Sequence, residues 1–282
     1  MRVAPALVLL LAVVGCERTP SGGPAPVEIA EPALRADESI LDARPDGSVA
    51  DARHGGATLL AREIPPRPDG DGVRQLVARK QIGAREIALG TVSDAKLIDR
   101  ATVVVRTDGT LERVDDDGAV RTLDKQAFGP ISVRNGKVAY VRGEMPELEV
   151  ALADVERGAP IALTAGFAPA WCPAIADDGS VVFVSARKSA TELVRARVGE
   201  EPRTLGLWTD SPPPLPEGPF APIVAGDRLI FESGDGLAVL SLDGVLRKTI
   251  PGLRAPVLRG DRVMLRGEAG LRTMSVAEVL AP

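Results

Sequence analysis

Short apolar runs separated by turn dipeptides dominate the chain from about residue 34 onward. Runs rich in β-branched residues lie at positions 101–106, 137–141, 180–185, 228–232 and 262–266. Eight Asp-Gly dipeptides and Asn135-Gly136 punctuate the sequence, and such dipeptides accept the positive φ angles that two-residue hairpins require. Few stretches keep a helical apolar stripe, with residues 276–280 a short possibility. The pattern predicts an all-β chain of many short hairpins.

One order of features occurs four times: a triplet ending in proline, then a turn, then an apolar strand. The triplets are Phe128-Gly129-Pro130, Phe167-Ala168-Pro169, Phe220-Ala221-Pro222 and Arg254-Ala255-Pro256. A proline-rich stretch at 211–219 lengthens the interval between the second and third copies. Periods near 40 residues in an all-β chain indicate the four-stranded blades of a β-propeller. At roughly 42 residues per blade, residues 34–282 would form about six blades, within a range of five to seven.

The segment 169–187, PAWCPAIADDGSVVFVSAR, resembles the blade motif of the TolB-like propellers, which carry PD40 or WD40-like repeats. The usual form reads PAWSPDG, followed by an apolar strand and a serine. Here Cys172 takes the serine position, and four residues are inserted before Asp178-Gly179. The resemblance implies a propeller with Trp171, Phe183 and Phe231 in the core between blades. It does not extend to the Tol-Pal role, because the chain has no room for the N-terminal α/β domain of TolB.

The N-terminus carries an export signal. Met1-Arg2 precede an apolar run at 6–14 that is too short to span a bilayer, and Gly15 then precedes Cys16. This order resembles a bacterial lipoprotein signal, which implies removal of residues 1–15 and lipidation of Cys16. An ordinary signal peptide with an incidental cysteine is the alternative. Residues 16–33 are rich in proline and glycine and predict a flexible tether.

Location and partners follow from the same residues. In the lipoproteins that some Gram-negative bacteria retain at the inner membrane, aspartate follows the lipidated cysteine; this chain has Glu17, which favours the outer membrane. We expect the chain to face the periplasm as a monomer held to the membrane only by its lipid. The net charge of −5 makes nucleic acid a poor partner, because nucleic-acid binding needs clustered cations.

Candidate catalytic groups are few. His54 is the only histidine, which excludes a three-histidine zinc site and gives a Ser-His-Asp triad little support. Tyr140, the only tyrosine, lies in an apolar strand and is interpreted as core rather than as a sialidase nucleophile. Cys172 has no cation nearby and is interpreted as a small buried hydrophobe. We predict no catalytic residue and no cofactor.

Asp115, Asp116 and Asp117 form the densest acidic run. Adjacent carboxylates on a turn are a weak calcium candidate, because the run lacks the alternate spacing of an EF-hand loop and its distal glutamate. The competing interpretation is a solvated turn.

The predicted function is therefore a lipid-anchored β-propeller that binds another envelope protein or peptide and catalyses nothing. The preferred contact segment comprises Trp208 and the loop with Pro212, Pro213 and Pro214, since aromatic and polyproline elements lose little entropy on binding. An ordinary loop between blades is the alternative for this segment. Two other functions stay open. Acidic residues converging at a channel mouth would favour a propeller hydrolase, and a closed apolar pocket would favour a small-ligand sensor.

Overall fold

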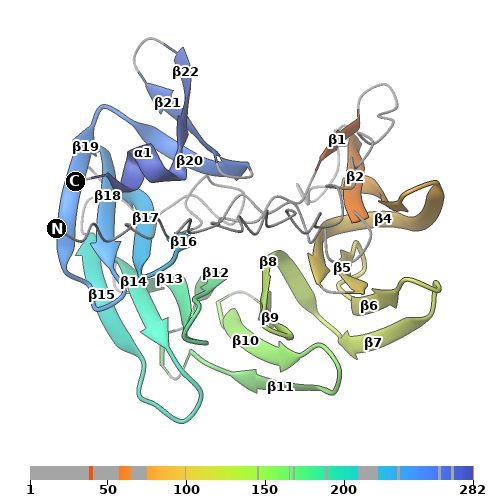
Figure 1. Cartoon of the computed structure of the whole chain (residues 1–282). Helices are drawn as coiled ribbons and strands as arrows, with labels where there is room; N and C mark the ends of the chain where they lie inside the picture. The colour runs from red at the N-terminus through yellow and green to blue at the C-terminus, as the bar shows by residue number, and fades with distance from the viewer. Residues whose placement is uncertain are drawn as a thin grey trace, which may run out of the picture. The chain divides into compact units, whose positions relative to one another are not determined.

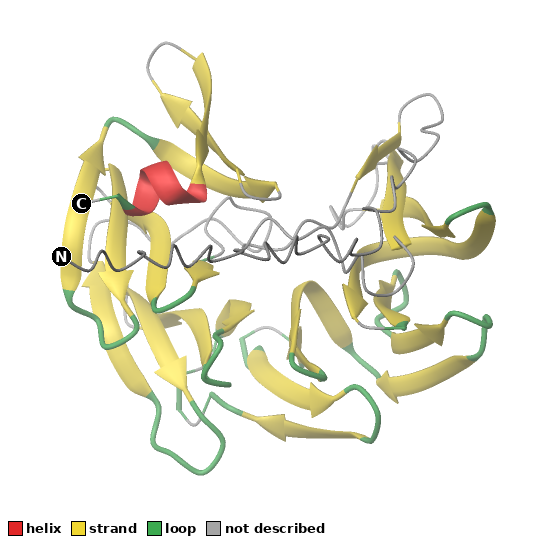
Figure 2. Ribbon diagram, in the orientation of Figure 1, coloured by secondary structure: helices red, strands yellow, loops and turns green. Residues whose placement is uncertain are grey.

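The computed structural model describes residues 38–40, 57–64, 75–98, 100–144, 146–164, 166–167, 169–187, 190–208, 222–233, 236–259, 262–267 and 270–281. All of these belong to one compact unit, Glu31–Pro282. Figures 1 and 2 show that this part of the chain consists almost entirely of β-strands, with a single short helix among the described residues. The predicted all-β class is confirmed.

The first sheet holds seven strands, each paired antiparallel with the next in the chain. Its strands are β1 (Glu38–Ile40), β2 (Ala57–Ile64), β3 (Gln75–Ile82), β4 (Arg85–Ile98), β5 (Ala101–Arg106), β6 (Leu111–Asp115) and β7 (Val120–Asp124). The long β4 changes partner along its length: residues 85–92 pair with β3 and residues 92–98 pair with β5. The seven strands therefore form two four-stranded groups that share β4.

Three four-stranded antiparallel sheets follow in chain order. The second sheet holds β8 (Ala127–Arg134), β9 (Lys137–Arg142), β10 (Glu149–Asp154) and β11 (Gly158–Ala162). The third holds β12 (Ala170–Ile175), β13 (Val181–Arg187), β14 (Ala190–Ala196) and β15 (Arg203–Trp208). The fourth holds β16 (Ile223–Ala225), β17 (Arg228–Ser233), β18 (Gly236–Ser241) and β19 (Leu246–Pro251). The repeated unit is thus a four-stranded meander, as the sequence period predicts.

The last described sheet has three strands and ends in the helix. It comprises β20 (Arg254–Arg259), β21 (Arg262–Gly267) and β22 (Gly270–Ser275), followed by α1 (Val276–Leu280). Ser275 caps α1 in a capping box with Glu278, while Val276 and Val279 pack into the neighbouring core. The short C-terminal helix is confirmed. The predicted number of blades and the domain boundaries at residues 15 and 33 stay predictions.

The core lies between successive sheets, and β13 shows how it is built. Val181 and Phe183 pack with residues of the second sheet, whereas Val182 and Val184 pack with residues of the fourth. Side chains alternate between the two faces of a strand, so a sheet covered on both faces needs an unbroken apolar run. Trp171 and Phe231 are buried in the same cluster as Val182 and Val184. The predicted core positions of Trp171, Phe183 and Phe231 are therefore confirmed.

The described Asp-Gly and Asn-Gly dipeptides all place glycine at a positive φ angle, and among them only Asn135-Gly136 has both residues there. Asn135-Gly136 joins β8 to β9 with positive φ angles of 49° and 72°, the combination of a type I′ hairpin turn.

The second copy of the proline repeat is placed on the wrong triplet by the sequence pattern. The register shift in β8 lies between Phe128 and Ser132, and the matching shift in β12 lies between Trp171 and Ala174. The counterpart of Phe128-Gly129-Pro130 is therefore Trp171-Cys172-Pro173, four residues beyond the triplet chosen from the sequence.

Candidate functional site

A pocket of about 390 Å³ opens at one edge of the molecule, between the first and second sheets. Three connections meet there: the β4–β5 turn, the β8–β9 turn and the β10–β11 turn. They meet because alternate turns of an antiparallel meander lie at the same edge. The pocket is lined by Ile98, Arg100, Ala101, Arg113, Gly136, Val155 and Glu156. Its walls therefore combine apolar side chains with two cations and one carboxylate.

Arg113 forms the charged floor of the pocket. Its side chain is 13% exposed, its Nε donates to Asp115 Oδ1 at 2.6 Å, and its Nη1 pairs with Glu156. Burial by itself would lower the pKa of Arg113, but the hydrogen bonds to Glu156 and Asp115 outweigh burial and raise that pKa. The guanidinium is therefore a permanent cation, placed where a carboxylate can reach it.

Glu156 supplies that carboxylate from the β10–β11 turn. Its side chain is 69% exposed, and its Oε2 also lies 3.5 Å from Arg121 Nη2. The hydrogen bond from Arg113 holds the pKa of Glu156 below its ordinary range, so the side chain is ionised at neutral pH. Arg100, which also lines the pocket, is exposed and has no ion-pair partner among the side chains that the structure describes. The pocket lining itself thus carries two guanidinium groups and one carboxylate.

The acidic run lies beside the pocket, but its three carboxylates do not converge. Asp115 accepts from Arg113, Asp116 pairs with Lys80 of β3, and Asp117 Oδ1 accepts from the Ala119 amide at 2.9 Å. No group of three potential metal ligands occurs within the described stretches. The arrangement is that of a turn fixed to its neighbours, and it offers calcium no shared set of oxygens.

Lys80 and Arg113 belong to a repeated contact that the sequence analysis missed. Each lies on the third strand of a four-stranded group, at the same register position, opposite Leu59 and Val103 respectively. Lys80 pairs with Asp116, which lies in the turn after β6, the third strand of the next group. Arg113 pairs in the same way with Glu156, in the turn after β10. The sequence gives little signal for this contact, because β3 (QLVARKQI) and β6 (LERVD) each hold several other polar residues beside the buried cation.

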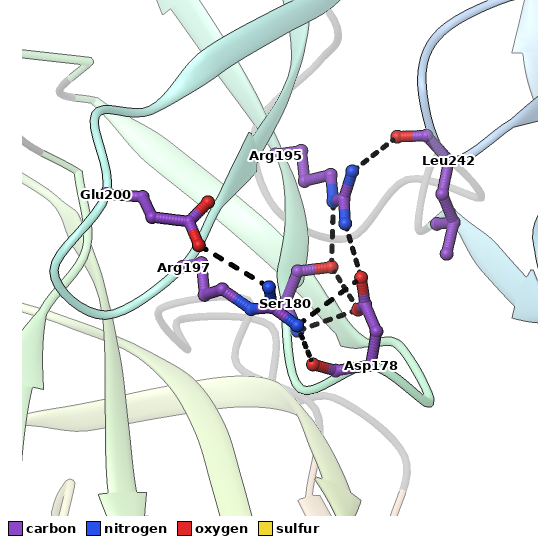
Figure 3. A network of polar contacts seen from close by, with 6 residues as sticks. All are labelled: Asp178, Ser180, Arg195, Arg197, Glu200 and Leu242. Carbon is purple, nitrogen blue, oxygen red and sulfur yellow. Dashed lines mark hydrogen bonds and ion pairs between the residues drawn. The ribbon is translucent and has the colours of Figure 1, made fainter.

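A third contact of this kind holds the third sheet to the fourth (Figure 3). Arg195 of β14 donates from Nη1 to the Leu242 carbonyl at 3.1 Å and from Nε to Ser180 Oγ at 2.9 Å, and its Nη2 pairs with Asp178. Ser180 in turn donates to Asp178 Oδ1 at 2.6 Å. Burial would raise the pKa of Asp178, but these hydrogen bonds and the charge of Arg195 lower it. The buried Ser180 hydroxyl donates to Asp178 and accepts from Arg195, so both of these polar contacts belong to the link between the sheets.

Tyr140 and Cys172 are buried, as their interpretation as core residues predicts. Burial, and then the hydrogen bond to Asp124, raise the pKa of the Tyr140 hydroxyl. Burial raises the pKa of the Cys172 thiol to about 12. Both groups are neutral at physiological pH, which leaves them without the anionic form that a nucleophile needs.

Several predicted site residues lie outside the described part of the chain. These are Cys16, His54, Pro212, Pro213 and Pro214. Trp208 ends β15, but its side chain is not described. The preferred contact segment and the lipidation site therefore stay predictions. Within the described stretches, no helix has the length and apolar character needed to cross a membrane.

No protein-family model matches the chain, and no curated protein matches it. TolB from Acinetobacter baumannii is a similar solved structure, with 13% identity, a TM-score of 0.44 and 79% of this chain covered; the chain spans 62% of that TolB. A gluconolactonase from Xanthomonas campestris matches with 18% identity, a TM-score of 0.47 and coverage of 87% of this chain and 99% of the other. The computationally designed Ika8 protein matches with 12% identity, a TM-score of 0.50 and coverage of 77% and 68%.

At these identities the likeness concerns the fold alone. The succession of four-stranded antiparallel meanders is that of a β-propeller, and TolB proteins are among the structures with a similar fold.

Proposed function

We propose that the chain is a non-catalytic β-propeller that binds another protein or peptide of the bacterial envelope. A lipid on Cys16 would hold it at the outer membrane, with the folded body facing the periplasm on the tether of residues 16–33. The lipid is needed because the chain is acidic and has no helix, among its described residues, that could cross the membrane. Trp208 and the Pro212–Pro214 run remain the proposed contact segment.

The observation that carries this proposal is the state of the charged groups at the pocket edge. Asp115 pairs with Arg113 of its own strand, whereas Asp116 and Glu156 pair with Lys80 and Arg113 from other strands. A glycosidase needs a carboxylic acid whose pKa is raised so that it can donate a proton. The pKa values of Asp154 and Glu156 are instead lowered, through hydrogen bonds from Lys137 and Arg113. Such an edge suits recognition by shape and charge better than proton transfer.

Exposed apolar side chains on the same edge support a binding role. Val120 and Leu246 begin the outer strands β7 and β19, and Val198 and Val245 lie in the equivalent turns of their sheets. Each of the four is exposed to solvent, in or next to a tight turn with glycine at a positive φ angle: Gly118, Gly199 or Gly244. A rigid edge with apolar side chains between paired charges has the composition of a protein interface.

The non-catalytic half of the proposal is tested by turnover. The full-length mature protein in detergent should release no product above buffer from a panel of esters, lactones, glycosides and peptides, with or without added calcium. The reason is that the described acidic and hydroxyl groups at this edge are committed to structural partners. A triple Asp115→Asn, Asp116→Asn, Asp117→Asn variant serves as a check, with Asp243→Asn on the related turn of the fourth sheet as its control. Turnover that the triple variant loses and the control keeps would establish a hydrolase instead.

A further inference from the structure

We infer that the pocket between the first and second sheets binds a carboxylate of the partner peptide, and that Glu156 occupies this site while the partner is absent. The inference rests on the proposed function, because it names the chemistry of the partner in that same binding role. It is carried by the geometry of Arg113 and Glu156 and by the two guanidinium groups, Arg113 and Arg100, that line the pocket.

Glu156 differs from the groups that accept a hydrogen bond from a cation in the two related contacts. Lys80 is 1% exposed and pairs with Asp116 within the first sheet, and Arg195 contacts a backbone carbonyl. Glu156, by contrast, is a mostly exposed side chain on a turn, bound to a guanidinium that is mostly buried. An exposed glutamate can rotate into solvent at little cost, whereas Arg113 is held in place by its second bond, to Asp115. The movable member of the pair is therefore the carboxylate.

The site left by such a rotation is suited to a carboxylate from outside. Guanidinium groups bind carboxylates through parallel N–H donors, more specifically than a lysine does. With Glu156 turned away, Arg113 and Arg100 would both face a pocket that they line, with Arg121 on its border near Val155. Asp115 would keep its hydrogen bond from Arg113 Nε and would neutralise only part of the positive charge of these guanidinium groups. An external carboxylate would then take the place of Glu156 on Arg113 Nη1.

The remaining walls fit a peptide backbone. Ile98, Ala101 and Val155 give apolar surface, and Gly136 has no side chain to fill the space in front of it: a Cβ built there would meet nothing within 4 Å. A volume of about 390 Å³ is at the lower end of the range for ligand pockets. This is room for one or two residues, so the carboxylate would belong to a chain end or to an acidic side chain.

The expected effect follows from competition. When an internal group occupies a site for part of the time, the apparent affinity of an external ligand is reduced by the fraction of free sites. An exposed ion pair contributes modestly, and its carboxylate also repels an incoming anion. Replacing Glu156 by glutamine should therefore tighten binding of a carboxylate peptide by about three- to tenfold, since it removes both effects.

Fluorescence polarisation with three labelled peptides tests this on the full-length mature protein. The first has a free C-terminal carboxylate and neutral side chains, the second is its C-terminal amide, and the third is an amidated peptide with one glutamate. Glu156→Gln should tighten binding of the first, the third or both, and neither form should bind the neutral amide. Comparing the affinities of the first and third peptides shows whether the site binds a C-terminal carboxylate or a glutamate side chain. The matched control is Glu147→Gln, which removes an exposed charge at the opposite end of the second sheet and should change nothing.

The cations provide the second arm. In the Glu156→Gln background, Arg113→Gln should abolish peptide binding, and thermal unfolding shows whether the variant is folded. Arg100→Gln, at an exposed position, should weaken binding by at least about threefold without changing stability. Equal binding of carboxylate and amide peptides, or a Glu156→Gln variant that binds no better than Glu147→Gln, would overturn the inference. Either result leaves the proposed binding function intact. Hydrolytic turnover, by contrast, would refute the non-catalytic binding function but not the carboxylate site.

Discussion

A Cys16→Ser variant is expected to leave the membrane fraction completely. Lipidation requires the cysteine thiol, and a serine hydroxyl does not replace it. Without the lipid, the remaining apolar run at 6–14 is too short to span a bilayer, and the net charge of −5 gives no attraction to anionic lipid. Two or more acyl chains make membrane retention stable, at about 0.8 kcal/mol for each buried methylene. Detergent-phase partitioning, with mass spectrometry of the N-terminal peptide, measures the effect.

The chain offers its own control for this variant. Cys172 is the second cysteine, buried and free, so a Cys172→Ser variant loses a thiol but keeps the proposed anchor. It should stay in the detergent phase, like the parent protein. A Cys16→Ser protein that remains with the membrane at high salt would refute lipid anchoring.

A Phe183→Ala variant is expected to lose about 3–5 kcal/mol of unfolding free energy, the usual cost of removing a buried aromatic ring. Phe183 is 0% exposed and lies with Val150 and Val194 in the cluster between the second and third sheets. Since whole domains are stable by only about 5–15 kcal/mol, this is a large share of the total. Urea unfolding followed by circular dichroism measures it.

Phe128→Ala is the matched control, because it removes the same ring from a side chain that is 41% exposed. Its loss should be clearly smaller, at about 1 kcal/mol, since less apolar surface leaves contact with other residues. A Phe183→Ala protein no less stable than Phe128→Ala would contradict the packing of side chains between sheets that defines the fold.

The strands were predictable because their signals are local. An Asp-Gly or Asn-Gly pair accepts the turn angles by itself, and an apolar run between two such pairs has no other compact solution. Residues 101–106, predicted from the run ATVVVR, form β5 with the same limits. The core positions of Trp171, Phe183 and Phe231 followed from the same reading, because a strand covered on both faces needs large apolar residues throughout.

Features that depend on the pairing register were not predictable. Pro169 and Pro173 are both prolines before the same turn, and only the ladder between β12 and β13 shows that Pro173 lies at the register shift. The acidic run is a similar case. From the sequence, Asp115 and Asp116 could share a metal ion. Asp116 is instead paired with Lys80 of β3, whose position beside the turn depends on the tertiary fold.

The pocket also depends on distant parts of the chain. Arg100, Gly136 and Glu156 lie on three different turns and meet only through the stacking of two sheets. Lys80 and Arg113 give no clear signal of their contacts either, because each lies in a strand with several other polar residues. The partner in each contact cannot be read from one sequence.

Site-specific photo-crosslinking in living cells tests most directly the central claim, that this edge binds an envelope protein. A photoreactive amino acid replaces Arg100 in the full-length, lipidated chain, and a second protein carries it at Glu147, at the other end of the second sheet. We predict one adduct of discrete mass from position 100 and none from position 147, with the adduct lost when Cys16 is also changed to serine. No adduct from position 100, or equal adducts from both positions, would contradict the claim.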